Sequence, residues 1–333
     1  MVTLTLPGWL EPYRDLARGK ATRAQHQAML RQLVWPVFGI AVFLLLWQWA
    51  AQNINTSLGQ FPGPAAVWEQ AGNLVGEHQE ARERKAAFME RQEKMIESRL
   101  AQQPDWEPVR RNYTGAPTFF DQIGTSLVTV MSGFLLASVI AIPLGIVIGL
   151  SSTVHAAMNP LIQLFKPVSP LAWLPLVTMV VSAVYVSDDP MVSKSFLNSM
   201  FTVTLCCLWP TLMNTAVGVT SVSQDLTNVS RVLRLSALAH VRKIVLPSAL
   251  PMMFTGLRLS LGIAWMVLIA AEMLAQNPGL GKFVWDEFQN GSSQSLGRIM
   301  VAVIAIGLIG FLLDRLMLML QRALVWDKSA AQR

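Results

Sequence analysis

Long apolar stretches without charge dominate the pattern of this 333-residue chain. Long runs that contain no Asp, Glu, Lys or Arg include residues 122–165, 167–187, 195–224 and 299–313. A helix rises about 1.5 Å per residue and the hydrocarbon of a bilayer is about 30 Å thick, so roughly 20 apolar residues cross it. The pattern therefore predicts membrane-spanning helices and excludes a soluble enzyme.

These runs and two further apolar stretches predict an all-α, polytopic membrane protein with about six transmembrane helices. The first predicted span lies too far along the chain to be the core of a cleavable signal peptide, so we expect a retained helix there. The predicted spans cover residues 33–51, 124–150, 168–186, 196–219, 251–275 and 298–320.

Basic residues beside the spans set the expected orientation, because Lys and Arg concentrate on the cytoplasmic side. Residues 1–32 carry five of them, residues 220–250 carry four, and the chain after residue 320 carries three. The alternate segments 187–195 and 276–297 carry one each. Six spans with both termini in the cytoplasm place the richer segments inside.

The external loop, residues 52–121, contains a predicted charged helix over about 77–103. This stretch lacks Gly and Pro, and it pairs Glu80 with Arg84 at helical spacing. Two interpretations are open: a solvated spacer that rests on the ends of its own spans, or a docking surface for an external partner. Both start from a narrow apolar stripe, which consists of Phe88, Met89, Met95, Ile96 and Leu100.

Composition agrees with a membrane protein: 14% of residues are charged and the mean hydropathy is +0.42. The net charge of +6 does not indicate nucleic-acid binding, because the surplus lies beside the spans and residues 77–111 carry eight basic and eight acidic groups. The two cysteines, Cys206 and Cys207, are adjacent within an apolar run, which favours neither a disulfide framework nor a zinc site.

No motif for covalent chemistry is found. The stretch Gly279–Phe283 comes nearest to a nucleotide-binding loop, but it lacks the first glycine and the Ser/Thr. The four histidines lack metal-ligand spacing, and no G-x-S-x-G occurs. We therefore expect a protein that is not an enzyme, with no cofactor and no metal of its own.

Charged residues inside apolar spans are costly and often functional. Arg258 lies about two turns inside the fifth predicted span, where it either reaches the cytoplasmic interface or lines a pathway that attracts an anion. Asp314 and Arg315 are expected to reach the interface. Arg258, Glu272 and Trp265 are the candidate pathway residues.

The cytoplasmic segment 220–250 contains two predicted amphipathic helices. The first carries Leu226, Val229, Val232 and Leu233 at helical spacing, and Ser236 is placed to cap the second, which Pro247 is expected to stop. Such a pair, with excess basic charge, indicates a surface that binds a cytoplasmic partner. An interfacial loop is the alternative.

This segment resembles the coupling loop of ABC importer permeases, whose pattern is E-A-A, three residues, Gly, nine residues, Ile, one residue, Leu-Pro. Ile244, Leu246 and Pro247 match its end, Asn228-Val229-Ser230 occupy the E-A-A positions, and Arg234 replaces the glycine. An arginine avoids the positive φ that glycine permits. The resemblance to the nitrate, sulfonate and bicarbonate branch continues through residues 166–176, 208–215, 254–274 and 279–288.

The resemblance implies a type I ABC importer permease-like fold over residues 122–328. It follows a cytoplasmic segment (1–32), a first span (33–51) and the external loop, and precedes a tail (329–333). A bacterial inner-membrane complex is implied, with a second copy (a homodimer), two cytoplasmic ATPase subunits that bind ATP, and an external solute-binding protein in addition to the bilayer. The implied ATPase contacts are Asn228, Val229, Ser230, Arg231, Arg234, Ser236, Ile244, Leu246 and Pro247.

The stretches at 228–236 and 208–215 resemble nitrate permeases most, with sulfonate, cyanate and bicarbonate permeases as alternatives. A stand-alone secondary transporter or channel is the alternative of a different class. It would show internal repeats with helices broken at matching positions, and the sequence contains no convincing repeat.

Overall fold

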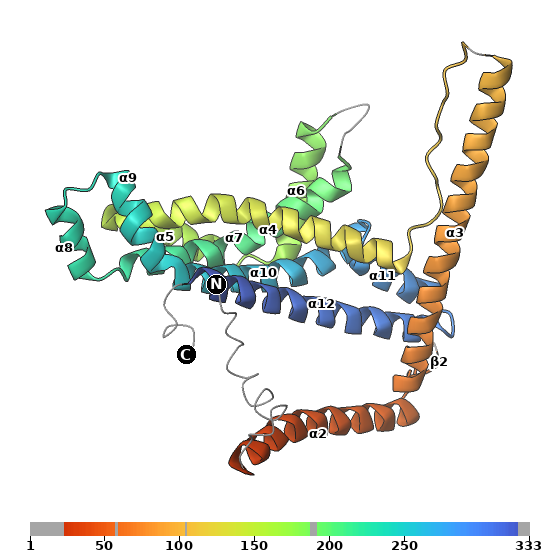
Figure 1. Ribbon diagram of the computed structural model, residues 1–333, viewed down its shortest axis with the longest axis horizontal. Coiled ribbons are helices and arrows are strands. Elements are labelled where there is room, and N and C mark those ends of the chain that lie inside the picture. Colours follow the sequence, from red (N-terminus) through yellow and green to blue (C-terminus); the bar gives the residue numbers. More distant parts are fainter. Residues whose placement is uncertain (1–22, 57–58, 104, 187–191, 326–333) are drawn as a thin grey trace. The chain divides into compact units, whose positions relative to one another are not determined.

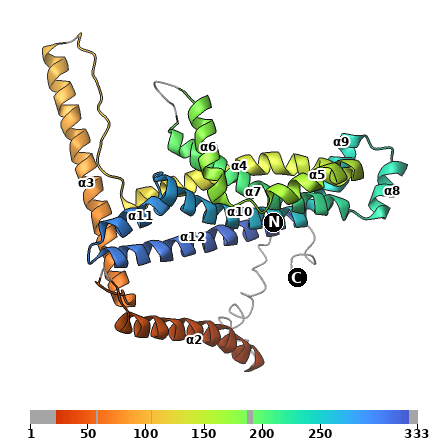
Figure 2. The ribbon, with the colours of Figure 1, turned by 180° about the vertical axis from the view of Figure 1, so that it is seen from behind.

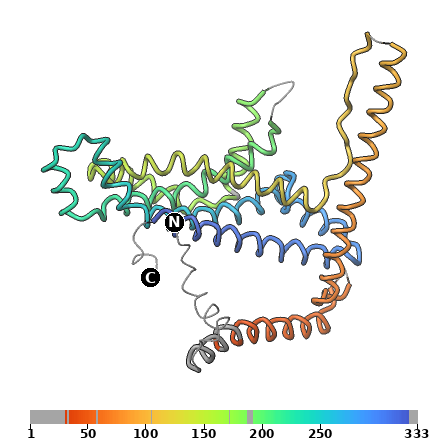
Figure 3. Tube along the Cα trace, in the orientation of Figure 1, coloured from red at the N-terminus to blue at the C-terminus, as the bar shows by residue number. Residues whose placement is uncertain are grey.

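The computed structural model describes residues 23–56, 59–103, 105–186 and 192–325 (Figures 1 and 3). The chain divides into two compact units, residues 1–69 and 70–333. The predicted segments 1–32 and 329–333 lie wholly or largely outside the described residues.

The first unit contains the first apolar helix, α2 (Arg23–Asn53), and a short antiparallel pair, β1 (Asn55–Thr56) and β2 (Gly59–Gln60). The indole N–H of Trp47 donates a hydrogen bond to the carbonyl of Pro62 over 3.0 Å, which ties the helix to the chain that follows it. The apolar side chains of α2 are mostly exposed, as expected of a helix that faces lipid. A helix over the predicted span 33–51 is thus confirmed.

The second unit is all-helical in its described part. Thr118 begins α4 with a reciprocal cap, in which its hydroxyl accepts from the Asp121 amide and the Asp121 carboxylate accepts from the Thr118 amide. After α3 (Pro64–Gln102), which starts in the first unit, the helices are α4 (Phe119–Leu150), α5 (Ser152–Phe165), α6 (Pro170–Val184), α7 (Lys194–Thr220), α8 (Gln224–Val232), α9 (Ala237–His240), α10 (Leu246–Ala275), α11 (Leu280–Asn290) and α12 (Ser295–Leu324).

Helices α4, α7, α10 and α12 run side by side in the core of this unit (Figures 1 and 2). Phe134, Phe254 and Met317 join α4, α10 and α12 in one buried cluster. Helix α4 approaches α7 closely at Gly145, where a β-carbon would lie 2.7 Å from the carbonyl oxygen of Leu212. Small residues permit such close helix packing in membranes.

Five helical stretches within the described residues are long and apolar enough to cross a bilayer: Val34–Asn53, Phe119–Leu150, Lys194–Thr220, Ala237–Ala275 and Ser295–Leu324. The predicted span at 168–186 forms the shorter helix α6, whose 15 residues rise about 22 Å. Pro167 and Pro170 separate α6 from α5, because neither can continue a helix with its own amide. The third predicted span is therefore the second part of a broken helical element.

The predicted charged helix is confirmed as α3, which begins earlier than predicted. Its pairs at helical spacing are formed, and the Lys94 ammonium lies 2.6 Å from a carboxylate oxygen of Glu90. On the apolar stripe, the Phe88 ring contacts the Tyr113 ring at 5.5 Å between centroids, and the Gln92 amide donates to the Arg111 carbonyl. The chain's own return segment, residues 105–118, thus contacts Phe88 of the stripe, whereas Met89 and Met95 remain exposed, so both interpretations of α3 stay open.

Candidate functional site

The two amphipathic helices predicted within residues 220–250 are α8 and α9. The Ser223 hydroxyl caps α8, and the Ser236 hydroxyl caps α9 by accepting from the Ala239 amide over 3.4 Å. Apolar side chains of this segment are exposed, with Val232 at 82% and Leu238 at 77%. The segment presents an apolar and basic surface, which we call the coupling surface; it consists of Leu226, Asn228, Val229, Arg231, Val232, Leu233, Arg234 and Leu238.

The prediction that Pro247 stops the second helix is wrong. Helix α9 continues through a π-helical turn, Val241–Val245, directly into α10, and Pro247 lies in the first turn of α10. The Leu246 amide donates to the carbonyl of Val241, five residues earlier, so the helix widens into a π-helical turn directly before the proline and continues past it. The coupling surface is therefore joined without a loop to a membrane-spanning helix.

Arg234 adopts the left-handed conformation that the family pattern assigns to glycine, with φ at 47°. Its amide donates to the Arg231 carbonyl, and the Leu235 amide donates to the Ser230 carbonyl over 3.1 Å. These two bonds form the Schellman motif that ends many helices. The arginine thus reproduces the glycine turn, at a cost of about 1 kcal/mol relative to glycine.

The implied ATPase contacts fall into two groups. Asn228, Val229, Arg231, Arg234, Ser236 and Pro247 are exposed, Leu246 is half-buried, and Ser230 and Ile244 are buried. The Ser230 hydroxyl lies 2.8 Å from the Nδ1 atom of His240 and so ties α8 to α9. This group stabilises the segment from within, and the exposed group is available to a partner.

At the opposite end of the helices, a buried carboxylate holds α11. Glu272 is only 1% exposed. Its two oxygens accept from the Ser126 hydroxyl at 2.8 and 2.9 Å, and one of them also accepts from the Gly281 amide at 2.9 Å. The Leu280 amide donates to the Ser126 oxygen. Glu272 therefore fixes the first turn of α11 to α4 and α10.

Arg298 of α12 holds the other end of α11 to α3. Its guanidinium lies 2.6 Å from Glu287 and 2.7 Å from Glu77, and it stands over the Phe283 ring. The base of α3, α11 and the start of α12 are thereby joined by one cation. No signal in the sequence pointed to this cluster, because Glu77 lies more than 200 residues before Arg298 in the chain.

The candidate pathway residues Arg258 and Trp265 are both engaged within the chain. The Arg258 guanidinium donates to a carboxylate oxygen of Asp314 at 2.9 and 3.1 Å. The Trp265 indole donates to the Ile306 carbonyl. Both residues line a cavity of about 230 Å³ between α10 and α12. The cation and the anion compensate each other there, a pairing that the sequence did not indicate.

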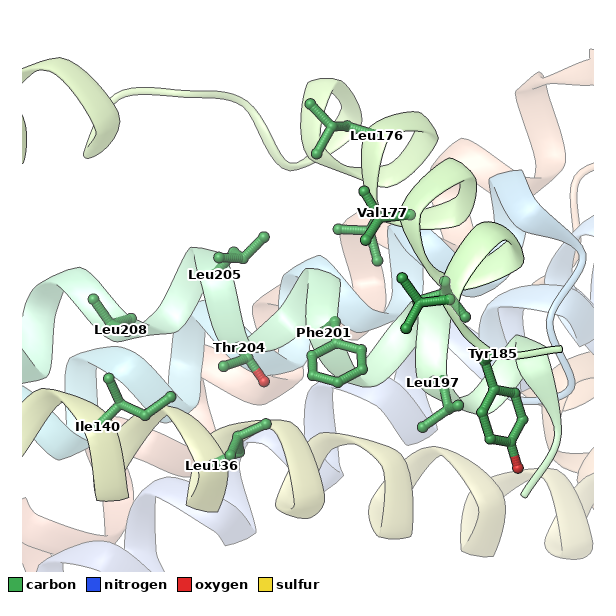
Figure 4. Close-up of a pocket in the computed structure, with 13 residues that line it drawn as sticks. Leu136, Ile140, Leu176, Val177, Tyr185, Leu197, Phe201, Thr204, Leu205 and Leu208 are labelled. Atoms are coloured by element: carbon green, nitrogen blue, oxygen red, sulfur yellow. The ribbon is translucent and has the colours of Figure 1, made fainter. Parts of the chain in front are cut away.

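A larger apolar groove of about 650 Å³ lies between α4, α6 and α7 (Figure 4). Leu136 and Ile140 come from α4, Leu205 and Leu208 from α7, and Leu176 and Val177 of α6 lie across from them. Its lining holds no charged side chain.

A comparison of the sequence with models of protein families identifies the family to which the chain belongs. The family described as "Binding-protein-dependent transport system inner membrane component" matches residues 141–326, more than half of the chain. The chain belongs to this family of permeases. The charged helix α3 lies outside the matched residues, as the resemblance in the sequence indicated.

Relatives and a solved structure agree with this assignment. The permease is 38% identical to a nitrate import permease protein, NrtB, of Synechocystis, over 88% of this chain and 90% of the relative. It is 39% identical to a bicarbonate transport system permease protein, CmpB, of Synechococcus elongatus, over 61% and 68%. Its fold is similar to a chain of the MetNI methionine ABC transporter, with a TM-score of 0.53, 13% identity, and coverage of 62% of this chain and 95% of that one.

Replacing Arg234 by glycine is expected to stabilise the end of α8. Glycine adopts positive φ without the steric cost that arginine bears, so the turn should gain about 1 kcal/mol. Hydrogen exchange of the amides of residues 234–236 should then slow by roughly fivefold. Arg234→Ala is the matched control, because it removes the same side chain and keeps the steric cost. Equal protection in the two variants would contradict this account.

Proposed function

We propose that this permease imports nitrate. The observation that carries the proposal is 38% identity to a nitrate import permease over nearly the full length of both chains. The stretches at residues 228–236 and 208–215, which resemble nitrate permeases most, support it from the sequence. The similarity to a bicarbonate permease is of the same order over a shorter alignment, so bicarbonate is the second candidate.

We further propose that the permease works in an ATP-driven complex. Two copies form the pathway, two ATPase subunits bind the coupling surface in the cytoplasm, and a solute-binding protein delivers the anion from outside. Four basic residues and exposed apolar side chains on residues 220–250 suit this surface to a cytoplasmic partner. ATP is bound and hydrolysed by the partner subunits in this scheme, and the permease carries no ATPase site.

The direct connection of α9 to α10 gives the proposed complex a means of transmission. A displacement of α8 and α9 passes through the π-helical turn into α10 without a flexible loop. Helix α10 packs against α7 and α4 along its length, so its movement changes the membrane core. ATP binding outside the membrane can thereby alter access to a pathway within it.

The proposal is tested by uptake of labelled nitrate in cells that carry or lack this chain, with its neighbouring subunits present. Uptake should be lost on deletion and on depletion of ATP. Competition with unlabelled bicarbonate, cyanate and a sulfonate then sets the selectivity. Unchanged nitrate uptake on deletion, with redundant routes removed, would reject nitrate. Uptake that requires the chain but survives ATP depletion would favour a secondary transporter.

A further inference from the structure

The break between α5 and α6 carries a lysine. Helix α5 ends at Phe165, Lys166 is its C-cap, and α6 starts at Pro170. Figures 1 and 3 show α5 lying along α4 and α6 turning away from it after the break. The Lys166 side chain is exposed in the single chain.

Lys166 lies near the middle of the predicted membrane thickness. The ring of Phe165 stacks on the ring of Trp209, with centroids 6.2 Å apart and planes 9° apart. Trp209 stands in the middle of α7, about 22 Å from its start at Lys194 and about 16 Å from its end at Thr220. The 14 residues of α5 rise about 21 Å, so Lys166 is far from the cytoplasmic end of its own helix.

A cation at this depth in the membrane faces the interior of the assembly or a water-filled cavity, and an opposite charge there is its most favourable partner. In the described part of the chain, Lys166 forms no ion pair and no side-chain hydrogen bond. The acidic residues of the described spanning helices are already engaged: Asp121 caps α4, Glu272 holds α11 and Asp314 pairs with Arg258. A second copy would bring the same engaged groups.

Two indole donors beside the break also lack an acceptor. Trp173 and Trp209 both contact the ring of Phe165, and the N–H groups of both are buried without a hydrogen-bond partner. A buried donor without a partner costs about 1–3 kcal/mol in general. An acceptor that enters the break would relieve this cost.

We propose that Lys166 is the cationic site of the translocation pathway and that it binds the transported anion transiently in the middle of the membrane. This inference rests on the proposed function and deepens it. The site would take a small monovalent oxyanion such as nitrate or bicarbonate, which supplies both the negative charge and the acceptor oxygens. Half-helices that meet near the bilayer midplane are a common setting for such sites in transporters.

The test uses the assembled transporter with Cys206 and Cys207 replaced by alanine and a single Lys166→Cys substitution. Labelled nitrate uptake should fall by roughly tenfold or more, because the compensating charge is lost. Treatment with 2-aminoethyl methanethiosulfonate converts the cysteine to a side chain ending in an ammonium, and uptake should return. The neutral methyl methanethiosulfonate should not restore it, and excess nitrate should slow the reaction with both reagents.

Lys194→Cys is the matched control, because Lys194 is an exposed lysine at the start of α7 and should respond to neither reagent. Uptake by Lys166→Cys close to its parent, or equal rescue by both reagents, would overturn the proposal. If the parent transports bicarbonate and not nitrate, the nitrate assignment fails while the same variants still test Lys166 with bicarbonate. If the cysteine variant does not assemble, Lys166→Arg must retain uptake and Lys166→Gln must lose it, and equal uptake by the two would overturn the site.

Discussion

Reversing the charges of Arg231 and Arg234 to glutamate is expected to abolish ATP-driven uptake while the protein still inserts into the membrane. Both side chains are exposed on the coupling surface, and neither forms an ion pair within the described residues. Placing two negative charges where a partner accommodates two positive ones costs several kcal/mol at an interface. Uptake should therefore fall by roughly a hundredfold or more.

Four measurements separate coupling from folding in this double variant. Membrane insertion and thermal stability should match the wild type, co-purification of the ATPase subunits should fall, and so should uptake. Arg322→Glu, at the end of α12, is a control for a reversal of positive charge outside the coupling surface. Normal uptake by the double variant would refute the assignment of this surface to the ATPase subunits.

The sequence predicted those elements whose cause is local. Charge-free runs predicted the long helices of the membrane core, and Ser236 predicted the start of α9, because a capping hydroxyl acts within three residues of itself. The pairing of Glu90 with Lys94 was predictable for the same reason. The family resemblance added membership of the permease family, and the family match confirmed it.

The features that the sequence did not predict depend on packing between distant segments. Pro247 signals a helix end by local rules, yet the π-helical turn before it lets the helix continue. The cluster around Arg298 joins residues more than 200 positions apart, such as Glu77. Lys166 was visible as the single charge between two apolar runs, but its depth became clear only from the stacking of Phe165 on Trp209.

Removing the carboxylate of Glu272 is expected to destabilise the protein more than other single changes near this end of the helices, opposite α8 and α9. Glu272→Ala leaves a void in a closely packed site and deprives the Gly281 amide and the Ser126 hydroxyl of their acceptor. Unpaired buried donors and the loss of packing together cost roughly 2–5 kcal/mol. Helix α11 packs tightly against α10 at Gly279 and Gly281. A β-carbon at either position would overlap Glu272 or the backbone of α10, so no larger residue fits at this contact.

The measurement is the thermal unfolding midpoint, together with hydrogen exchange of residues 279–291. Both should show α11 released in Glu272→Ala, and Glu272→Gln should lie between that variant and the wild type because it retains one carbonyl acceptor.

Asp286→Ala is the matched control on the same helix, since its pair with Lys282 is exposed and such pairs contribute at most about 1 kcal/mol. Equal unfolding midpoints for Glu272→Ala and Asp286→Ala would show that the buried carboxylate does not hold α11. The hydrogen-bond partners of Glu272 among the described residues lie in α4 and α11, away from α8 and α9. A loss of uptake in this variant with the ATPase subunits still bound would therefore locate the defect at that end of the permease.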